Sequence, residues 1–350
     1  MPDAPTLARH FMDYLSDSMA WLARRDGSVV VGHGPFEESA EAPVSGVSFY
    51  VQDFALEGSA PWKTPNRVER ITTTELAKRY SDAPPLACEW DTLDAAPFSV
   101  IFQEIMSCIQ GGIFEKTVPV VTETGGSCPN PGNSVIAAMT QQPAPLYSYG
   151  WIHPASGFAG ATPELLFSLK GNRLETMALA GTARSEDREV FAVDEKEIRE
   201  HEYVAQTLVS KLLDLGTVER LSREILDLGP IVHFLTTIGL DLNFPQLADN
   251  LIKRLHPTPA LGPLPRTNET LRLLYDWRKR LACPSEFGAP FGLYDEGRFD
   301  AVVAIRGIWW DGQKLMLPAG CGIIEASRLV NEWRELRLKR EAVKRFLAPP

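Results

Sequence analysis

The alternation of apolar and polar positions along the chain predicts both helices and strands. Apolar residues recur every three or four positions in several stretches, which predicts helices over residues 7–22, 98–113, 191–215, 245–255, 267–282 and 328–346. Short runs rich in apolar and β-branched residues predict strands over 28–31, 47–54, 117–122, 146–153, 164–169, 173–178, 231–240, 301–310 and 314–318. A Lys170-Gly171-Asn172 turn predicts a hairpin. Groups of antiparallel-looking strands separated by helices favour an α+β fold.

The composition is that of an ordinary globular protein. The chain has 350 residues, of which 44% are hydrophobic and 23% are charged. Such a chain can bury a large core, either in one large domain or in two smaller ones.

The net negative charge of the chain disfavours some classes of binding partner. A formal net charge of −10 disfavours a nucleic-acid partner, because a phosphate backbone requires a basic field. An acidic protein that binds an anionic small molecule must supply positive charge locally, through a few Arg and Lys side chains or through a bound metal ion. We expect both kinds of charge in one pocket.

The cysteines and the apolar runs indicate a compartment. Five scattered cysteines without CxxC spacing argue against a disulfide framework or a zinc site; they are Cys88, Cys108, Cys128, Cys283 and Cys321. The first residues lack an apolar signal core, and no run of about 18 apolar residues occurs. We therefore expect a cytoplasmic protein without a membrane partner.

Two pairs of glutamates lie on predicted helices. Glu197 and Glu200 share one helical face, and Glu332 and Glu335 share another, because each pair is separated by three positions. Each pair offers oxygen donors that suit one hard cation. The same spacing is also typical of a solvated helix face, and Lys339 would form an ordinary surface ion pair with Glu335.

Two further residues have the chemistry of an acid and a base. Lys116 directly precedes a predicted strand, where burial can remove its proton and make it a general base. Glu164 begins an apolar strand, where burial would raise its pKa and suit it to act as an acid. Both positions are also compatible with a side chain that simply faces solvent.

Two glycine-bearing segments and one arginine complete the candidates. Leu179-Ala180-Gly181-Thr182 and Ala319-Gly320-Cys321-Gly322 lack the spacing of a dinucleotide or Walker loop. Their glycines either let backbone N–H groups approach a ligand carboxylate or form tight turns. Arg306 interrupts a predicted strand of Val, Ala, Ile and Trp, and burying it unpaired would be costly. We expect a carboxylate partner for it.

The order and spacing of these segments resemble the chorismate-utilising enzymes, a family that includes isochorismate, salicylate, anthranilate and aminodeoxychorismate synthases. The resemblance covers residues 95–347. Its motifs are Lys116, Pro163-Glu164-Leu165, Leu179-Ala180-Gly181-Thr182, Lys196-Glu197-Ile198-Arg199-Glu200-His201, His233, Leu255-His256-Pro257-Thr258-Pro259-Ala260-Leu261-Gly262, Ala304-Ile305-Arg306, Ala319-Gly320-Cys321-Gly322-Ile323-Ile324 and Glu332-Trp333-Arg334-Glu335 with Lys339.

The resemblance implies a fold and a division of the chain. Residues 1–350 would form one α+β domain, in which two antiparallel β-sheets pack face to face with helices outside. The active site would lie in a cleft between the layers. Residues 1–94 would be an N-terminal part of this fold, and 95–347 would be its catalytic core.

The resemblance also implies a cofactor and its ligands. Mg²⁺ would be bound directly by Glu200 and Glu335 and supported through water by Glu197 and Glu332. The ion would bind one carboxylate of the substrate, chorismate. Magnesium prefers oxygen ligands and keeps water, so these residue types suit it.

The remaining family positions would contact the substrate. Arg306, Lys339 and the backbone N–H groups near Gly320 and Gly322 would hold the enolpyruvyl carboxylate. The residues that would line the ring site are Gly181, Thr182 and His233.

The residue at position 116 distinguishes members of the family. Members that add water resemble this chain in having a lysine there, whereas the ammonia-using members usually have glutamine. Lys116 would deprotonate the attacking water, while Glu164 protonates the departing ring hydroxyl. The chain is therefore closest to the isochorismate synthases, which serve menaquinone or siderophore biosynthesis. Ala180 counts against aminodeoxychorismate synthase, which often has a lysine at that position.

Two departures from the family pattern keep other functions open. Phe287 and Ala289 stand where the family usually has a Tyr and a Gly, so one hydroxyl contact with the substrate is missing. The alternatives are a salicylate synthase, an ammonia-using anthranilate or aminodeoxychorismate synthase with a separate glutaminase subunit, and a non-catalytic chorismate-binding protein. We see no Leu-Leu-Glu-Ser-type feedback site, and we expect no regulation by tryptophan.

Overall fold

A computed structural model describes residues 18–86, 88–126, 131–142, 144–312 and 314–347. Its helices are α2 (Thr73–Arg79), α3 (Ala96–Gln110), α4 (Gly132–Thr140), α5 (Arg188–Phe191), α6 (Glu195–Leu212), α7 (Ala248–Leu255), α8 (Asn268–Arg280) and α9 (Leu329–Leu347), with a 3₁₀ turn at Ser185–Asp187. Its strands up to residue 170 are β1 (Met19–Ala23), β2 (Ser28–Ser39), β3 (Val47–Val51), β4 (Trp62–Thr72), β5 (Glu89–Trp90), β6 (Lys116–Thr117), β7 (Val120–Gly126), β8 (Tyr147–Ile152), β9 (Ser156–Thr162) and β10 (Leu165–Lys170). The later strands are β11 (Arg173–Arg184), β12 (Gly216–Arg220), β13 (Glu224–Asp227), β14 (Ile231–Leu242), β15 (Pro290–Asp295), β16 (Arg298–Val303), β17 (Gly307–Asp311), β18 (Lys314–Gly320) and β19 (Ile323–Ile324).

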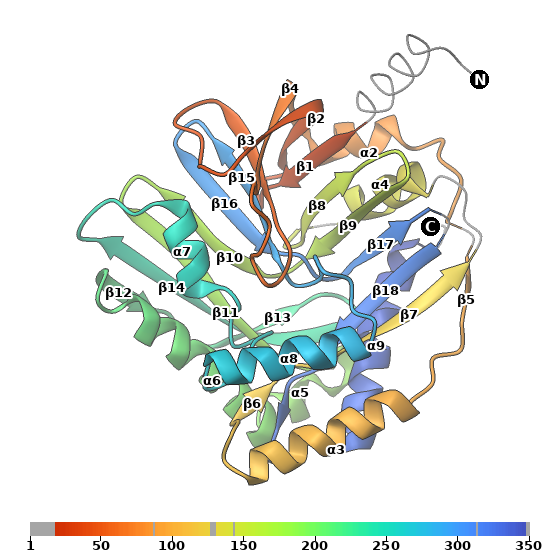
Figure 1. The fold of residues 1–350 in the computed structure, drawn as a ribbon, viewed down its shortest axis with the longest axis vertical. Coiled ribbons are helices and arrows are strands. Elements are labelled where there is room, and N and C mark those ends of the chain that lie inside the picture. Colours follow the sequence, from red (N-terminus) through yellow and green to blue (C-terminus); the bar gives the residue numbers. More distant parts are fainter. Residues whose placement is uncertain (1–17, 87, 127–130, 143, 313, 348–350) are drawn as a thin grey trace.

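Antiparallel pairing joins most of these strands into one sheet (Figure 1). One half runs through β14, β11, β10, β16, β15 and β3. Strand β4 connects it to the other half, which runs through β2, β1, β8, β9, β17, β18 and β7. The predicted α+β class is confirmed, and the two facing layers are hydrogen-bonded to each other through β4.

The two halves of the sheet pack face to face. Tyr149 of β8 and Phe158 of β9 lie against Phe291 of β15, with ring centroids 5.6 and 5.9 Å apart. The apolar core between the halves also contains Leu22 of β1 and Leu179 of β11. Because neighbouring residues of a strand point to opposite faces, each half has a second apolar face to cover.

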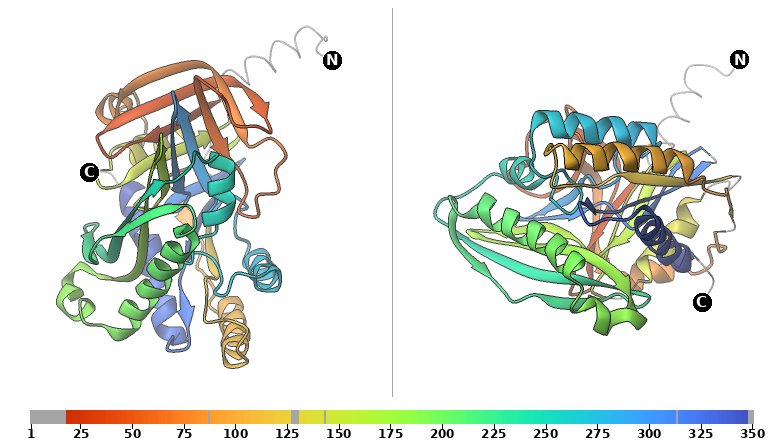
Figure 2. Two further views of the ribbon diagram at one scale, coloured as in Figure 1. Left: turned by 90° about the vertical axis from the view of Figure 1, so that its left-hand side faces the viewer. Right: turned by 90° about the horizontal axis from the view of Figure 1, so that it is seen from below.

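Helices cover the two outer faces of the sheet, as Figures 1 and 2 show. Helices α6 and α7 contribute Val204, Leu208 and Leu251 to the core outside the first half. Helices α2, α4 and α9 cover the second half, where Trp21 and Trp310 are buried. Helices α3 and α8 lie side by side below the sheet (Figure 2), linked by Trp277 and Arg280 of α8, which donate hydrogen bonds to Glu104 of α3.

Several sequence predictions need correction. Residues 19–22 of the predicted first helix form strand β1, paired with β2 and β8; residues 7–17 of that helix lie outside the described part of the chain, as does Cys128. The predicted strand 117–122 is divided into β6 and β7, and Pro119 lies between them. The predicted strand 301–310 is divided at residues 304–306, where Arg306 has a φ of 58°.

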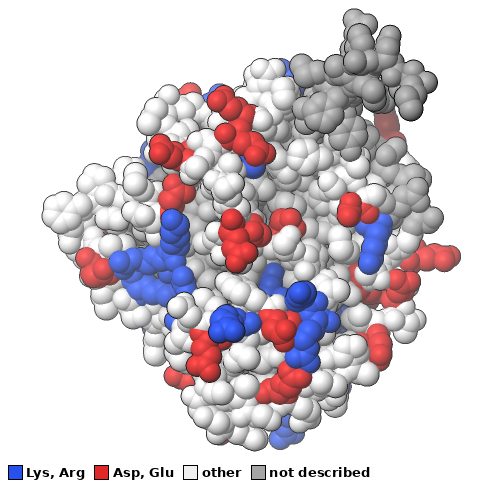
Figure 3. Space-filling view, viewed as in Figure 1, with Lys and Arg blue, Asp and Glu red and all other residues white. Residues whose placement is uncertain are grey.

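The described surface carries charges of both signs. Figure 3 shows acidic and basic side chains interspersed over one face of the molecule. Within the described residues, no helix is long and apolar enough to cross a membrane.

Candidate active site

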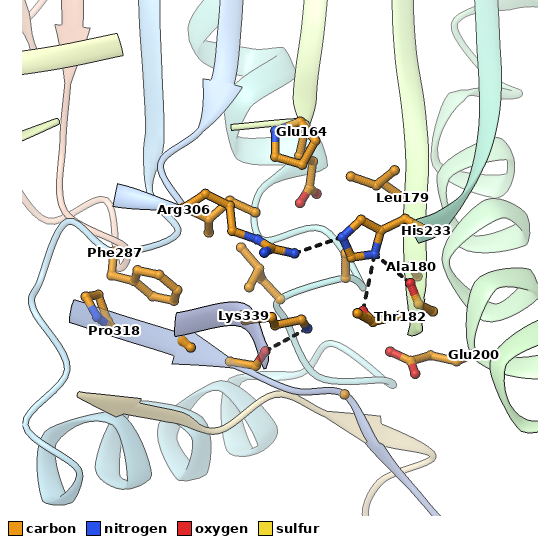
Figure 4. A pocket seen from close by; sticks show the side chains of 18 residues that line it. Glu164, Leu179, Ala180, Thr182, Glu200, His233, Phe287, Arg306, Pro318 and Lys339 are labelled. Atoms are coloured by element: carbon orange, nitrogen blue, oxygen red, sulfur yellow. Dashed lines mark hydrogen bonds between the residues drawn. The ribbon is translucent and has the colours of Figure 1, made fainter. Parts of the chain in front are cut away.

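A cavity lies where strands β11, β14 and β18 come near helices α6 and α9, and Figure 4 shows the side chains that line it. The space outside the atoms in this cavity, including its opening to solvent, is about 650 Å³. The lining residues are Pro163, Glu164, Leu179, Ala180, Gly181, Thr182, Glu200, His233, Ala260, Leu261, Phe287, Ile305, Arg306, Pro318, Ala319, Gly320, Gly322 and Lys339. Segments far apart in the sequence thus bring most of the predicted site residues to one place.

Arg306 enters the cavity from a strained position in the chain. Its left-handed backbone conformation, unusual for a residue other than glycine, ends one strand and turns the side chain toward His233 (Figure 4). The Nη2 group of Arg306 lies 2.8 Å from Nε2 of His233. No carboxylate among the described residues forms an ion pair with Arg306, so the expected carboxylate partner is wrong for the protein itself. Its partly buried positive charge is therefore available to an anionic ligand.

His233 fixes the orientation of this arginine. Its Nδ1 atom lies 2.7 Å from the carbonyl oxygen of Gly181, which can only accept a hydrogen bond, so Nδ1 carries the proton. The unprotonated Nε2 atom then accepts from Arg306. Burial, reinforced by the charge of Arg306, lowers the pKa of His233 well below its usual value. A neutral His233 therefore directs Arg306 without adding charge.

A second cation faces the same space. The Nζ group of Lys339, on α9, donates to the carbonyl oxygen of Gly320 at 2.9 Å and pairs with Glu335 at 2.6 Å. Figure 4 shows Lys339 below Arg306 at the centre of the cavity. The predicted anion-binding residues Arg306, Lys339, Gly320 and Gly322 therefore all line the cavity. The Thr182 N–H group is used differently, because it donates to Glu197 at 2.8 Å.

Glu164 lies at the top of the cavity in Figure 4. Its side chain is almost completely buried, and its Oε1 atom accepts a hydrogen bond from the Thr258 hydroxyl at 3.1 Å. Burial raises the pKa of Glu164 to about 7, and the Thr258 hydrogen bond and nearby cations offset only part of that effect. A carboxyl group with this pKa can donate a proton near neutral pH.

The raised pKa predicts a measurable effect on stability. Between pH 4.5 and about 7 the unfolded chain loses a proton that folded Glu164 keeps, so the protein loses stability as the pH rises through that window. The loss amounts to about 3 kcal/mol for a shift of this size. Glu164→Gln removes this loss, and urea unfolding at about pH 5 and pH 8 should show the variant gaining stability relative to the wild type. An identical pH dependence in both proteins would show that Glu164 is not held protonated.

Lys116 is completely buried directly behind the cavity wall. Its Nζ group lies 3.2 Å from Oε1 of Glu200 and donates to the carbonyl oxygen of Pro259 at 2.6 Å. Gly322 lies against both side chains, since a Cβ atom there would come within 2.8 Å of the Lys116 side chain and collide with Glu200. The missing side chain at Gly322 therefore leaves room for this buried ion pair.

One loop holds both proposed proton-transfer residues. Thr258 donates to Glu164, and the next residue, Pro259, accepts from Lys116. The loop also lines the cavity through Ala260 and Leu261. These residues belong to one of the family motifs, but their roles could not be predicted, because hydrogen bonds between such distant segments have no local signal.

The four predicted metal-binding glutamates approach one another from two helices. Glu197 and Glu200 lie on α6, while Glu332 and Glu335 lie on α9. The Nζ group of Lys196, a residue with no predicted role, lies among three of these glutamates. It is 2.8 Å from Glu197, 3.5 Å from Glu200 and 3.4 Å from Glu332. The spacing of Lys196 and Glu200, four positions apart, was the available signal.

The electrostatics of this cluster suit an added cation. Burial and repulsion by Glu200 raise the pKa of Glu197 to about 7, and burial and repulsion by Glu335 raise that of Glu332 to about 8. Burial would also raise the pKa of Glu200, but Lys116 and Lys196 outweigh it and lower that pKa to about 2. The nearby lysines therefore do not balance the acidic charge.

The donor atoms also fit a hard metal ion such as Mg²⁺. The Oε2 atom of Glu332 has no hydrogen-bond partner, although the side chain is only 1% exposed. Carboxylate oxygens are the ligands that Mg²⁺ prefers. As they stand, no three acidic, histidine or cysteine side chains of the described residues converge closely enough to hold a metal ion. The ammonium group of Lys196 lies among the acidic groups in this arrangement.

Phe287 contributes an apolar wall to the cavity. Its ring packs edge-on against Trp309 at 5.4 Å between centroids. The position that departs from the family pattern thus lines the cavity with a phenyl ring, which has no hydroxyl. Ala289 is buried and is not among the residues that line the cavity.

Known proteins resemble this chain in sequence and fold. Isochorismate synthase MenF of Haemophilus influenzae is 27% identical over 220 residues, covering 58% of this chain and 49% of that protein. Isochorismate synthase EntC of Escherichia coli is 32% identical over 193 residues, covering 51% of this chain and 48% of that protein. The chain thus spans about half the length of the curated relatives it matches. The solved structure of MenF, the menaquinone-specific isochorismate synthase from Escherichia coli, has a TM-score of 0.80 at 19% identity and covers 99% of this chain and 92% of that one, which shows a shared fold.

A family model described as chorismate binding enzyme matches residues 59–348. The matched region contains every site residue discussed above and most of both halves of the sheet. It extends further toward the N-terminus than the resemblance expected from the motifs. The chain therefore belongs to the chorismate-binding enzyme family.

Proposed function

We propose that the protein converts chorismate to isochorismate in a magnesium-dependent reaction. The observation that carries this proposal is that Glu164 lines the cavity and Lys116 lies buried directly behind its wall, each anchored by one of the consecutive residues Thr258 and Pro259. The names of the relatives MenF and EntC support the same activity.

The proposed reaction needs one proton acceptor and one proton donor. Lys116, in its uncharged amine form, takes a proton from water as the water oxygen bonds to the ring. Glu164 gives its proton to the ring hydroxyl, which departs as water on the other side. One water is added and one is released, so the product is an isomer of the substrate. The pKa of about 7 for Glu164 suits a residue that donates a proton in one direction and accepts it in the other.

Positive charge on two sides would hold the substrate. Arg306 and Lys339 would bind the enolpyruvyl carboxylate, and Phe287, Leu179 and Ile305 offer apolar contacts to the rest of the molecule. Glu200 and Glu335 would hold Mg²⁺ directly, with Glu197 and Glu332 supporting it through water. When bound, the ion would supply positive charge to the second carboxylate of the substrate.

The test is incubation with chorismate and Mg²⁺, followed by chromatography of the products. Isochorismate as the product supports the proposal, while salicylate, detected by its fluorescence, would mean that pyruvate is also lost. A product that depends on ammonium would indicate the ammonia-using alternative. Tight chorismate binding by calorimetry with no turnover by the folded protein would favour a non-catalytic binding protein.

A further inference from the structure

The ammonium group of Lys196 lies within the acidic cluster formed by Glu197, Glu200, Glu332 and Glu335. It reaches three carboxylates on two different helices, at distances of 2.8 to 3.5 Å. The fourth carboxylate, on Glu335, also attracts it. These contacts connect the first turn of α6 to the first turns of α9, so the lysine holds together two elements that are distant in sequence.

The ammonium group and a divalent ion would compete for the same oxygens. Mg²⁺ binds oxygen at about 2.0–2.1 Å in near-octahedral geometry, which is closer than any of the contacts of Lys196. Glu200, as a direct ligand, must therefore move toward the metal ion and give up its contact with the lysine, while the waters held by Glu197 and Glu332 would take the place of the ammonium group. Two cations among the same three carboxylates would also repel each other strongly.

A neighbouring cavity has room for the side chain of Lys196 after its displacement. Lys196 is 20% exposed and lies in a second cavity that borders the first at Thr182. That cavity is also lined by Glu186, Asp187 and Asp194, which are further acidic groups. A lysine has four flexible carbons and keeps its charge hydrated, so it can rotate toward them at little cost.

We propose that Lys196 is an internal counter-ion that occupies the metal position of the free protein and is displaced when the divalent ion binds. This inference rests on the proposed metal dependence of the function. It assigns Lys196 two effects. The lysine stabilises the metal-free fold, and it weakens metal binding because only molecules in which it has moved aside can bind the ion.

Metal binding without substrate tests this proposal. The proteins are the wild type, Lys196→Met and Lys211→Met, which removes a partly buried lysine from the other end of α6. Binding of Mn²⁺ is followed by electron paramagnetic resonance, and thermal unfolding is measured with EDTA. We expect Lys196→Met to bind Mn²⁺ about tenfold more tightly and to unfold about 3 °C lower when metal-free. Lys211→Met should bind Mn²⁺ like the wild type.

The outcomes separate this inference from the proposed function. Lys196→Gln, whose amide keeps hydrogen bonds without the charge, should also bind Mn²⁺ more tightly and serves if the methionine variant fails to fold. Equal or weaker Mn²⁺ binding by the folded variants, with binding by the wild type lost in Glu335→Gln, would overturn the inference and leave the metal site intact. Absence of Mn²⁺ binding in every protein would overturn both, since Lys196 would then be a permanent structural cation.

Discussion

Replacing Lys116 by glutamine is expected to lower kcat for isochorismate formation roughly 10²- to 10⁴-fold while changing KM little. Lys116 is the proposed base, and a glutamine amide cannot accept the proton of water. The amide can still donate to the carbonyl oxygen of Pro259, so one of the two buried contacts is kept. Steady-state kinetics with chorismate and saturating Mg²⁺ measures the effect.

The loss of a buried ion pair must be separated from the loss of a base. Lys116 pairs with Glu200, so circular dichroism and thermal unfolding should accompany the kinetics. Lys211→Gln is the control, because it removes a partly buried lysine that lies outside the cavity and should keep wild-type kcat. A folded Lys116→Gln protein that retains kcat within about threefold of the wild type would exclude Lys116 as the base.

Replacing Arg306 by methionine is expected to raise KM for chorismate about 10- to 100-fold without loss of stability. A hydrogen bond to a charged group contributes about 1.5–3 kcal/mol, and each 1.4 kcal/mol corresponds to about a factor of ten. The stability should be kept or increased, because Arg306 is partly buried and has no carboxylate partner among the described residues. Kinetics and urea unfolding of the same preparation measure both quantities.

Arg340→Met is a control for which the opposite pair of effects is expected, a loss of stability with an unchanged KM. Arg340 is buried, its Nε group pairs with Glu123 at 3.0 Å, and it does not line the cavity. Arg340→Met leaves that glutamate buried and less well paired, so the variant should lose stability while KM stays unchanged. A wild-type KM in Arg306→Met would show that another group binds the substrate carboxylate.

Local patterns predicted much of the fold. The hairpin of β10 and β11 and the helices α3, α8 and α9 follow from apolar spacing and from glycine turns, which are properties of a few neighbouring residues. Strand β1 was mistaken for a helix because its five residues are all buried and so lack the alternation of a strand with one exposed face. Its pairing with β2 and β8 is decided by tertiary packing.

The sequence predicted which residues form the candidate site, but it predicted only some of the contacts between them. The four glutamates, Lys116 and Glu164 carry chemistry that a motif can indicate. The ammonium position of Lys196 and the left-handed turn at Arg306 depend on how α6, α9 and β17 meet. No spacing in the sequence distinguishes an arginine paired with a carboxylate from one held by a neutral histidine.

The source of the new ring oxygen tests whether water, deprotonated by Lys116, is the nucleophile. Chorismate and isochorismate are isomers, so the protein should be incubated with chorismate and Mg²⁺ in water labelled with heavy oxygen, and the separated products analysed by mass spectrometry. We expect isochorismate that carries the label, formed by the wild type and barely by Lys116→Gln. Isochorismate without label, or a product that contains nitrogen from added ammonium, would contradict that expectation.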